Sequence, residues 1–199
     1  MIEENVSEEQ GLSKAIDPLD IIPEYLSDGR QNLRQGHILA TRASIMHQES
    51  LTRNDVEYHF HNIGAGVEFE NADEVRQQAE QCYRQAIDCY TTVTSYDRTH
   101  SVAYYYIGVA HTQLYNYELA IHNFDQAIKF DKEFAQAYNY RGVAKSLLEL
   151  YSSALKDFDM ALMYSDRDDG MIECNRDIVQ DAKDGKPTVL DTPWLSPFT

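Results

Sequence analysis

The sequence predicts an all-α fold, a right-handed solenoid of helical hairpins that ends in a C-terminal capping helix. Segments 104–134 and 138–168, with the alanine before each, align at a fixed offset of 34 residues, and twelve aligned positions are identical. The identities are Ala103/Ala137, Tyr104/Tyr138, Tyr106/Tyr140, Gly108/Gly142, Val109/Val143, Ala110/Ala144, Leu114/Leu148, Tyr117/Tyr151, Ala120/Ala154, Phe124/Phe158, Asp125/Asp159 and Ala127/Ala161. Large, small and apolar residues at helical spacing are what stacked hairpins need, and such stacks present grooves rather than catalytic centres.

Composition narrows the classes of partner. The chain has 199 residues, 33 acids against 17 bases and a formal net charge of −16. Because the excess of acid extends over the whole length and no basic patch emerges, nucleic-acid binding is not expected. No apolar run is long enough for membrane insertion, and the start lacks the order of a signal peptide, so we expect a cytoplasmic protein. The three cysteines form no C-x-x-C pair, and Cys82 and Cys89 are interpreted as reduced core residues.

The N-terminal quarter is expected to lie outside the repeats. Residues 1–28 are acidic and are broken by Pro18, Pro23 and Gly29, which indicates a flexible acidic arm. In segment 29–53, apolar residues recur at helical spacing from Leu33, so we predict an N-terminal helical segment.

The repeat domain is predicted to span 54–184. Ala86, Tyr90 and Val93 reproduce the spacing of the later repeats, and Asn71 followed three residues on by Glu74 is typical of a helix start. We therefore interpret 57–100 as a first repeat with a lengthened second helix from about 73 to 96. Segments 101–134 and 135–168 are the second and third repeats.

A capping helix and a tail are predicted after the third repeat. Segment 169–184 carries one apolar stripe on an otherwise polar sequence, as a solenoid end requires; its members are Met171, Ile172, Cys174, Ile178 and Val179. Segment 185–199 is a Pro-rich tail with three prolines after Lys186, so it cannot be helical there.

These residues resemble the tetratricopeptide repeat family, whose pattern is W-x2-L-G-x2-Y, then A-x3-F, then P. Tyr104-x2-Ile107-Gly108 followed by Ala120-x3-Phe124 matches it, and the third repeat matches again except that Arg141 stands where a Leu is usual. The terminal proline of the pattern is missing throughout. The glycines are expected to let the two helices of one unit approach closely, where a Cβ would separate them.

The resemblance implies that the first helix of each unit lines a concave, aromatic and largely neutral groove that binds a partner peptide. Carried onto this chain, the groove positions are Tyr58, His61, Ala65 and Phe69 in unit one, Val102, Tyr105, Val109 and Thr112 in unit two, and Gln136, Asn139, Val143 and Ser146 in unit three. Tyr106 and Tyr140 border them.

The carboxylate clamp of chaperone-binding members is not expected. Its Lys, Asn and Arg positions hold His61, Ala65, Tyr106, Gln136 and Tyr140 here, so no cation faces a terminal carboxylate.

Catalytic and metal sites are not predicted, and no cofactor is expected. His59 and His61 alternate, and alternate residues on a helix point about 200° apart, as do Asp157 and Asp159. The pair Gly64 and Gly66 lacks the strand and third glycine of a nucleotide loop.

Three functional hypotheses follow. The first is a non-catalytic protein-interaction adaptor or scaffold, whose binding should depend only weakly on salt. The second is a chaperone or assembly factor for one client, similar in layout to secretion chaperones. The third is a self-assembling module, a homo-oligomer in which the tail around Trp194 docks in its own or a neighbour's groove.

Overall fold

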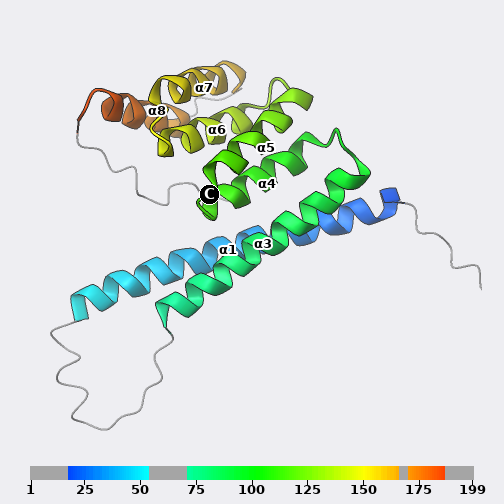
Figure 1. The fold of residues 1–199 in the computed structure, drawn as a ribbon, viewed down its shortest axis with the longest axis horizontal. Helices are drawn as coiled ribbons and strands as arrows, with labels where there is room; N and C mark the ends of the chain where they lie inside the picture. The colour runs from blue at the N-terminus through cyan, green and yellow to red at the C-terminus, as the bar shows by residue number, and fades with distance from the viewer. Residues whose placement is uncertain (1–17, 54–70, 166–169, 187–199) are drawn as a thin grey trace, which may run out of the picture.

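The computed structural model describes the backbone of residues 18–53, 71–165 and 170–186, and side chains from residue 21 to 47 and in the two later ranges. Within these ranges the chain forms helices and no strands (Figure 1). The helices are α1 (Pro18–Arg53), α3 (Ala72–Tyr96), α4 (Ser101–Gln113), α5 (Tyr117–Phe130), α6 (Ala135–Leu147), α7 (Tyr151–Tyr164) and α8 (Gly170–Lys183).

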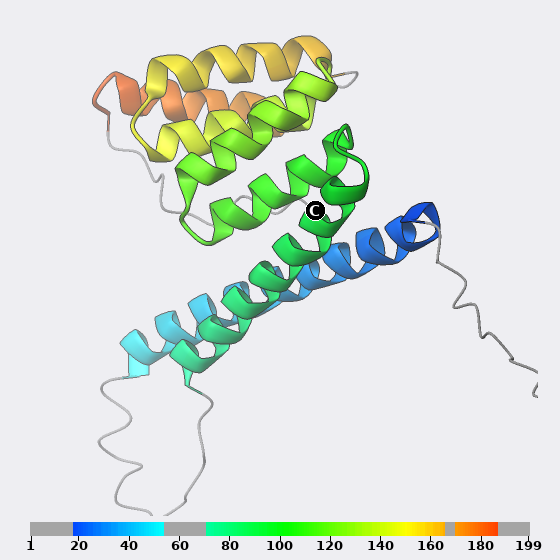
Figure 2. The ribbon, with the colours of Figure 1, turned by 45° about the vertical axis from the view of Figure 1, so that its right-hand side comes forward.

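The helices pair into antiparallel hairpins, each stacked on the next. The pairs are α1 with α3, α4 with α5 and α6 with α7, and α8 packs on α7 (Figures 1 and 2). Between hairpins, α3 packs against α4 and α5 against α6. The predicted all-α hairpin solenoid with a C-terminal cap is therefore confirmed.

A glycine facing an aromatic ring fixes the register inside every hairpin. A Cβ added to Gly108 would lie 2.6 Å from the Phe124 ring, and one added to Gly142 would lie 2.9 Å from the Phe158 ring. Since both rings are fully buried, the helices are held closer than any other residue would allow. The expected close approach at both glycines is observed.

The first hairpin uses the same device. A Cβ added to Gly29 of α1 would lie 2.8 Å from the ring of Tyr90 on α3, and Tyr90 stands 34 residues before Phe124. One heptad further along, Gly36 faces Tyr83 at the same 2.8 Å distance. Gly29 is thus the counterpart of Gly108, and α1 is the first helix of the first hairpin.

This pairing corrects two sequence-based interpretations. Residues 18–28, assigned to a flexible arm, form the start of α1, and the partner of α3 is α1 rather than segment 57–70, which lies outside the described residues. Pro18 is the first helical residue, where a missing N–H costs nothing. Pro23 is a few residues in, and the packing of Ile22, Tyr25 and Leu26 onto the core compensates for its lost hydrogen bond.

Aromatic contacts between hairpins also recur at 34 residues. Tyr90 stacks on Tyr106 with ring centroids 5.0 Å apart, and Phe124 meets Tyr140 at 6.2 Å, which joins hairpin one to two and two to three. The equivalence of these contacts identifies α3 as the second helix of a true repeat. Its helix start at Asn71 is as predicted, because the Asn71 side chain accepts a hydrogen bond from the Asp73 N–H at 3.0 Å.

The turns inside hairpins two and three are identical and contain no glycine. Tyr115 and Glu149, 34 residues apart, both have a φ of 60°. In each turn the following N–H returns to the helix before it: Asn116 donates to the His111 carbonyl and Leu150 to the Lys145 carbonyl, both at 2.9 Å. Non-glycine residues hold a left-handed conformation at a cost of about 1 kcal/mol.

The cap covers the third hairpin as predicted, with a different set of contacts. Ile172 and Val179 of α8 are buried against α7, together with the polar Asn175. Met171 and Cys174, placed on the same stripe from sequence, are exposed, and Ile178 is half-buried. The buried stripe, with Ile172 and Val179 seven residues apart, is narrower than the predicted one, and α8 packs mainly on α7, with a smaller contact to α6.

Candidate partner-binding face

The predicted groove residues of units two and three lie on α4 and α6, and most of them are buried. Val102 is 38% exposed, and Gln136, at the same place in unit three, is exposed too. The remaining predicted residues are each less than 7% exposed; they are Tyr105, Val109, Thr112, Asn139, Val143 and Ser146. The first turn of each of these two helices therefore carries the predicted positions that are accessible.

Tyr105 lies at the centre of an aromatic cluster. Its ring centroid is 5.0 Å from that of Phe134, 5.1 Å from Tyr106 and 5.5 Å from Tyr140. Burial raises the pKa of the Tyr105 hydroxyl well above its usual value, and so does the hydrogen bond that it donates to Tyr140. The ring joins hairpins two and three, which is a structural task.

Hydroxyl groups on this face bond to their own helices. Thr112 donates to the Gly108 carbonyl at 3.0 Å, and Ser146 donates to the Val143 carbonyl at 2.7 Å. Their polar atoms are therefore satisfied without a ligand.

Asn139 is covered by the cap. Its amide oxygen accepts a hydrogen bond from the Asn175 side chain of α8 at 3.1 Å, and both residues are 3% exposed. In unit three, the position that corresponds to Tyr105 is therefore in contact with the cap and is not accessible to a partner.

The unit-one groove positions need a new assignment. Tyr58, His61, Ala65 and Phe69 lie outside the described residues. Because Gly29 corresponds to Gly108, the positions equivalent to Tyr105, Val109 and Thr112 are Leu26, Arg30 and Leu33. Leu33 is buried, Leu26 is half-buried and Arg30 is exposed.

A signal for this assignment exists in the sequence. Tyr25-x2-Asp28-Gly29 has the spacing of Tyr104-x2-Ile107-Gly108, and the seven-residue interval between Gly29 and Gly36 equals that between Tyr83 and Tyr90. Sequence reasoning missed it because Asp28 replaces an apolar residue and a long interval separates the two helices.

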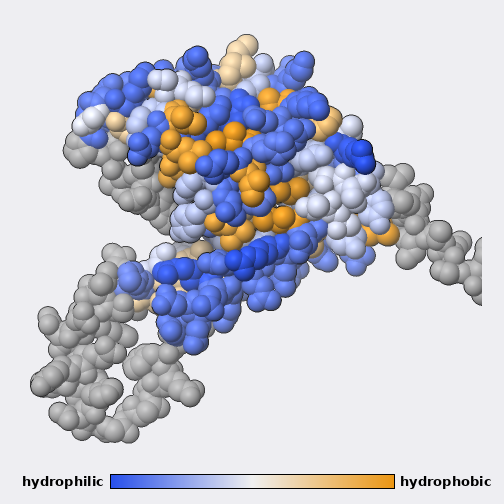
Figure 3. All heavy atoms as spheres, in the orientation of Figure 1, coloured by the Kyte–Doolittle hydropathy of each residue, from blue (hydrophilic) through white to orange (hydrophobic). Residues whose placement is uncertain are grey.

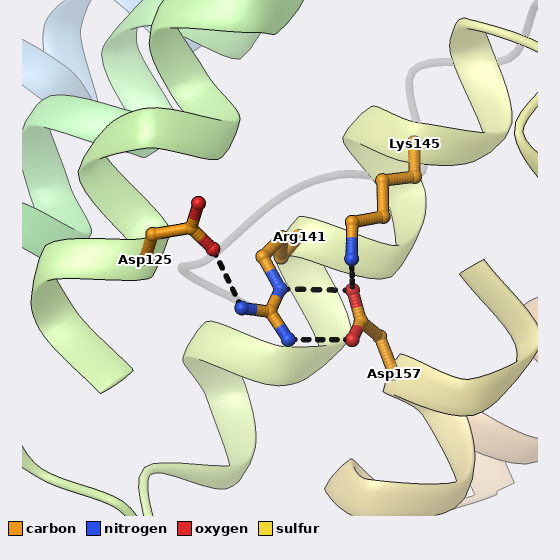
Figure 4. A network of polar contacts seen from close by, with 4 residues as sticks. All are labelled: Asp125, Arg141, Lys145 and Asp157. Atoms are coloured by element: carbon orange, nitrogen blue, oxygen red, sulfur yellow. Dashed lines mark hydrogen bonds and ion pairs between the residues drawn. The ribbon is translucent and has the colours of Figure 1, made fainter. Parts of the chain in front are cut away.

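Arg141, the departure from the family pattern, is at the centre of an ion network (Figure 4). Its guanidinium donates two hydrogen bonds to Asp157 of α7, at 2.9 and 2.6 Å, and one to Asp125 of α5 at 2.6 Å. Lys145 pairs with the same Asp157 carboxylate at 2.7 Å, and the guanidinium lies 5.3 Å from the Tyr138 ring centroid. Although desolvation opposes it, the pairing with Asp157 and Asp125 raises the pKa of Arg141.

This network ties α5, α6 and α7 together. The Arg141 guanidinium on α6 donates to carboxylates on both α5 and α7. We interpret it as a structural connection, since the Asp157 carboxylate is only 6% exposed and two cations already occupy it.

No metal-binding cluster is found in the part of the chain that the structure describes. His59 and His61 fall outside that part, and Asp157 is engaged by Arg141 and Lys145. Cys82 and Cys89 are free and half-buried rather than fully buried, and Asn32 approaches the Cys89 sulfur at 4.0 Å. No described helix is long and apolar enough to cross a membrane.

The visible surface divides along the hairpins (Figure 3). Hydrophilic residues dominate over α3, whereas hydrophobic residues are exposed over the region of α4, α5 and α6. The second and third hairpins are therefore the more apolar part of this face.

Known structures with a similar fold are tetratricopeptide repeat domains. The first such domain of Spaghetti (RPAP3), bound to an HSP90 peptide, superimposes with a TM-score of 0.50 at 23% identity, covering 53% of this chain and 85% of that one. The second domain of human RPAP3, in complex with an HSP70 peptide, gives a TM-score of 0.48 at 25% identity over 51% of this chain and 83% of that one. The Sgt2 domain from Aspergillus fumigatus gives 0.47 at 19% identity, over 60% and 83% of the two chains.

Sequence comparisons give no relative: no protein-family model and no curated protein matches the chain. At these identities the structural likeness establishes the fold alone. Together with the three equivalent glycine–aromatic contacts, it shows a fold like that of tetratricopeptide repeat domains.

Proposed function

We propose that this protein is a non-catalytic adaptor that binds a segment of a partner protein on the face formed by the first helices of its repeats. The observation that carries the proposal is the common register of the three hairpins, which places α1, α4 and α6 in equivalent positions. Proteins built this way use the resulting surface for binding. The RPAP3 domain of similar fold, bound to an HSP90 peptide, supports this class of function.

The contact surface is proposed to begin at the first turns of α4 and α6. Val102 and Gln136 are exposed there, and the half-buried Tyr106 lies one turn further along α4. The buried members of the predicted set, from Tyr105 to Ser146, hold this surface in shape from behind. The corrected unit-one positions hold Leu26 and the exposed Arg30, so this face carries a cation that the sequence analysis did not expect. It still lacks the lysine of the carboxylate clamp, and we do not extend the HSP90 peptide to this chain.

Site-specific photo-crosslinking tests the proposal. Benzoylphenylalanine is introduced at Val102, at Gln136 or at Met163, which is on the second helix α7 and is 72% exposed. After irradiation in native lysate, the first two variants are expected to yield the same protein adduct and the third none. Adducts of equal yield at position 163, or none at 102 and 136, would refute the binding face.

Self-association through the C-terminal tail is a separate proposal. Residues 187–199 include Trp194, the one tryptophan of the chain, and lie outside the described residues. A tail docked in a groove should give blue-shifted Trp194 emission that is protected from acrylamide. A red-shifted and fully quenchable spectrum would discard it.

A further inference from the structure

The charge of α1 differs from that of the rest of the chain. Residues 29–48 contain three arginines and two histidines and no Asp or Glu, whereas the chain as a whole has 33 acids against 17 bases. The acids of α1 flank this segment, with Asp20, Glu24 and Asp28 before it and Glu49 after it. The first three suit the positive end of the helix dipole, and the arginines follow towards the middle of the helix.

Two of these arginines share a face of α1 with two exposed isoleucines. At about 100° per residue, Arg30, Arg34, Ile38, Thr41 and Ile45 lie within an arc of about 80°. We name these five residues the α1 stripe. Ile38 and Ile45 are each 52% exposed, and both arginines are exposed as well.

The α1 stripe faces away from the core. The residues that α1 buries against α3 include Leu33, Gly36 and Ala43, on the other side of the helix. The major helix contact of α1 is with α3, so the stripe, which begins at the unit-one groove position Arg30, lies on the side of α1 that α3 does not cover. At the opposite end of the solenoid, α8 covers the last hairpin with a polar outer face.

Arg34 has no ion-pair partner among the described residues, whereas Arg76, Arg84, Arg141 and Arg176 each have at least one. Arg30 also has no carboxylate partner among the described residues, and its guanidinium lies near the Tyr90 hydroxyl. The stripe thus combines two cations with two exposed isoleucines that are seven residues apart. This arrangement is complementary to a partner helix with an acidic and an apolar face.

We propose that the α1 stripe docks an acidic amphipathic segment of a partner protein, with carboxylates on Arg30 and Arg34 and apolar side chains on Ile38 and Ile45. The inference rests on the proposed adaptor function and names the chemistry of the partner. Charge complementarity selects the occupant, because a net charge of −16 repels an acidic segment from most of the surface. Burying the two isoleucines supplies the attraction that survives salt, and the arginines set orientation and specificity.

A defined probe tests the proposal on the full chain. The probe is a fluorescein-labelled amphipathic peptide with two Glu and, seven residues apart, two Leu; a second peptide carries Gln for Glu. Binding is followed by anisotropy at about 50 mM and about 300 mM NaCl, where screening differs strongly. The Glu peptide should bind about tenfold more tightly than the Gln peptide at low salt and lose most of that difference at high salt.

Matched variants locate the site. Arg30→Glu with Arg34→Glu should weaken the Glu peptide about tenfold or more, and Ile38→Ser with Ile45→Ser should weaken both peptides. The control, Arg98→Glu with Lys156→Glu, changes the net charge equally at exposed positions elsewhere and should change affinity less than about twofold. All variants should retain the unfolding temperature of the unaltered chain.

Several outcomes would overturn the proposal. These are equal binding of the two peptides, no binding of the Glu peptide, or an equal loss in the control variant. Tighter Arg30-dependent binding of a single-stranded DNA of the same charge would instead show a polyanion site. A dimer that only Arg30→Glu with Arg34→Glu dissociates would show that a second copy occupies the stripe. If the photo-crosslinking variants at 102 and 136 give no adduct while the Glu peptide still binds, the adaptor face on α4 and α6 is refuted and the stripe is not.

Discussion

The first hairpin and the two that follow it differ in size but share one internal contact. In the first, α1 has 36 residues and α3 has 25, whereas α4 to α7 have 13 or 14 each. All three hairpins nevertheless place a glycine against a buried aromatic ring, at Gly29, Gly108 and Gly142. The register of a repeat therefore depends on this contact, and helix length varies independently of it.

The hairpins also differ in how they are extended. The first continues for another heptad with a second glycine–tyrosine contact, Gly36 with Tyr83, and its core is aromatic and apolar. The third adds charge instead, through Arg141, Lys145 and Asp157. The glycine–tyrosine contact extends the packing within one pair of helices, whereas the ion network connects neighbouring pairs.

The largest expected loss of stability comes from adding a side chain at the glycine that faces an aromatic ring in each hairpin. Gly108→Leu and Gly29→Leu should each lower the free energy of unfolding by about 3 kcal/mol, because the new side chain meets Phe124 or Tyr90 at less than 3 Å. Urea unfolding followed by circular dichroism measures this. Gly170→Leu is the control, since nothing lies within 4 Å of its added Cβ. If Gly108→Leu lowers the free energy of unfolding and Gly29→Leu does not, the two hairpins are not equivalent.

The ion network of the third hairpin is expected to follow in size. Asp157→Ala leaves Arg141 and Lys145 without their shared carboxylate and should cost about 3 kcal/mol, since that carboxylate is 6% exposed. Asp159→Ala, on the same helix, breaks a pair with Arg176 that is about half exposed and should cost less than about 0.5 kcal/mol. Similar losses in the two variants would contradict a structural role for the network.

The sequence predicted the second and third hairpins and the cap well, because their 34-residue period is visible in identical residues. It did not predict the first helix. Pro18, Pro23 and Gly29 are helix breakers by local propensity, and only the tertiary contact with Tyr90 shows Gly29 to be a packing position. The groove was predicted at residue level from family positions, but burial of Tyr105 and the Asn139–Asn175 contact depend on neighbouring hairpins, which local sequence does not reveal.

Alkaline pH should separate the buried tyrosines from the exposed ones. Burial raises the pKa of Tyr105 and Tyr140 above the usual 10, so the unfolded chain ionises first. Their contribution to stability is complete below pH 10 and is lost as pH rises towards the folded-state pKa, by about 1.4 kcal/mol per pH unit for each tyrosine.

Denaturant unfolding at pH 8, 10 and 11 measures this loss. Tyr105→Phe with Tyr140→Phe should give a shallower decline than the unaltered chain, and Tyr83→Phe with Tyr90→Phe should do the same for the first hairpin, since burial raises those pKa values too. Parallel declines in all three proteins would show that other groups dominate the alkaline transition.

The smallest expected effect is a gain. Glu149 has a φ of 60° at the end of α6, and glycine adopts this conformation without the clash of a Cβ. Glu149→Gly should raise the unfolding free energy by about 0.5 to 1 kcal/mol, and Tyr115→Gly by less, because it also loses the ring contact with Tyr117. A decrease at Glu149 in thermal melts would count against the repeated turn.

The pairing of α1 with α3 is tested most directly by a double-mutant cycle on Gly29 and Tyr90. Gly29→Ala should destabilise the unaltered chain, because the methyl group would lie 2.8 Å from the tyrosine ring. In a Tyr90→Leu background the same substitution should be neutral or stabilising, since alanine favours a helix over glycine by about 1 kcal/mol. This change of sign is the expected result in urea unfolding. Equal stabilisation by Gly29→Ala in both backgrounds would show that α1 does not pack on α3 in this register.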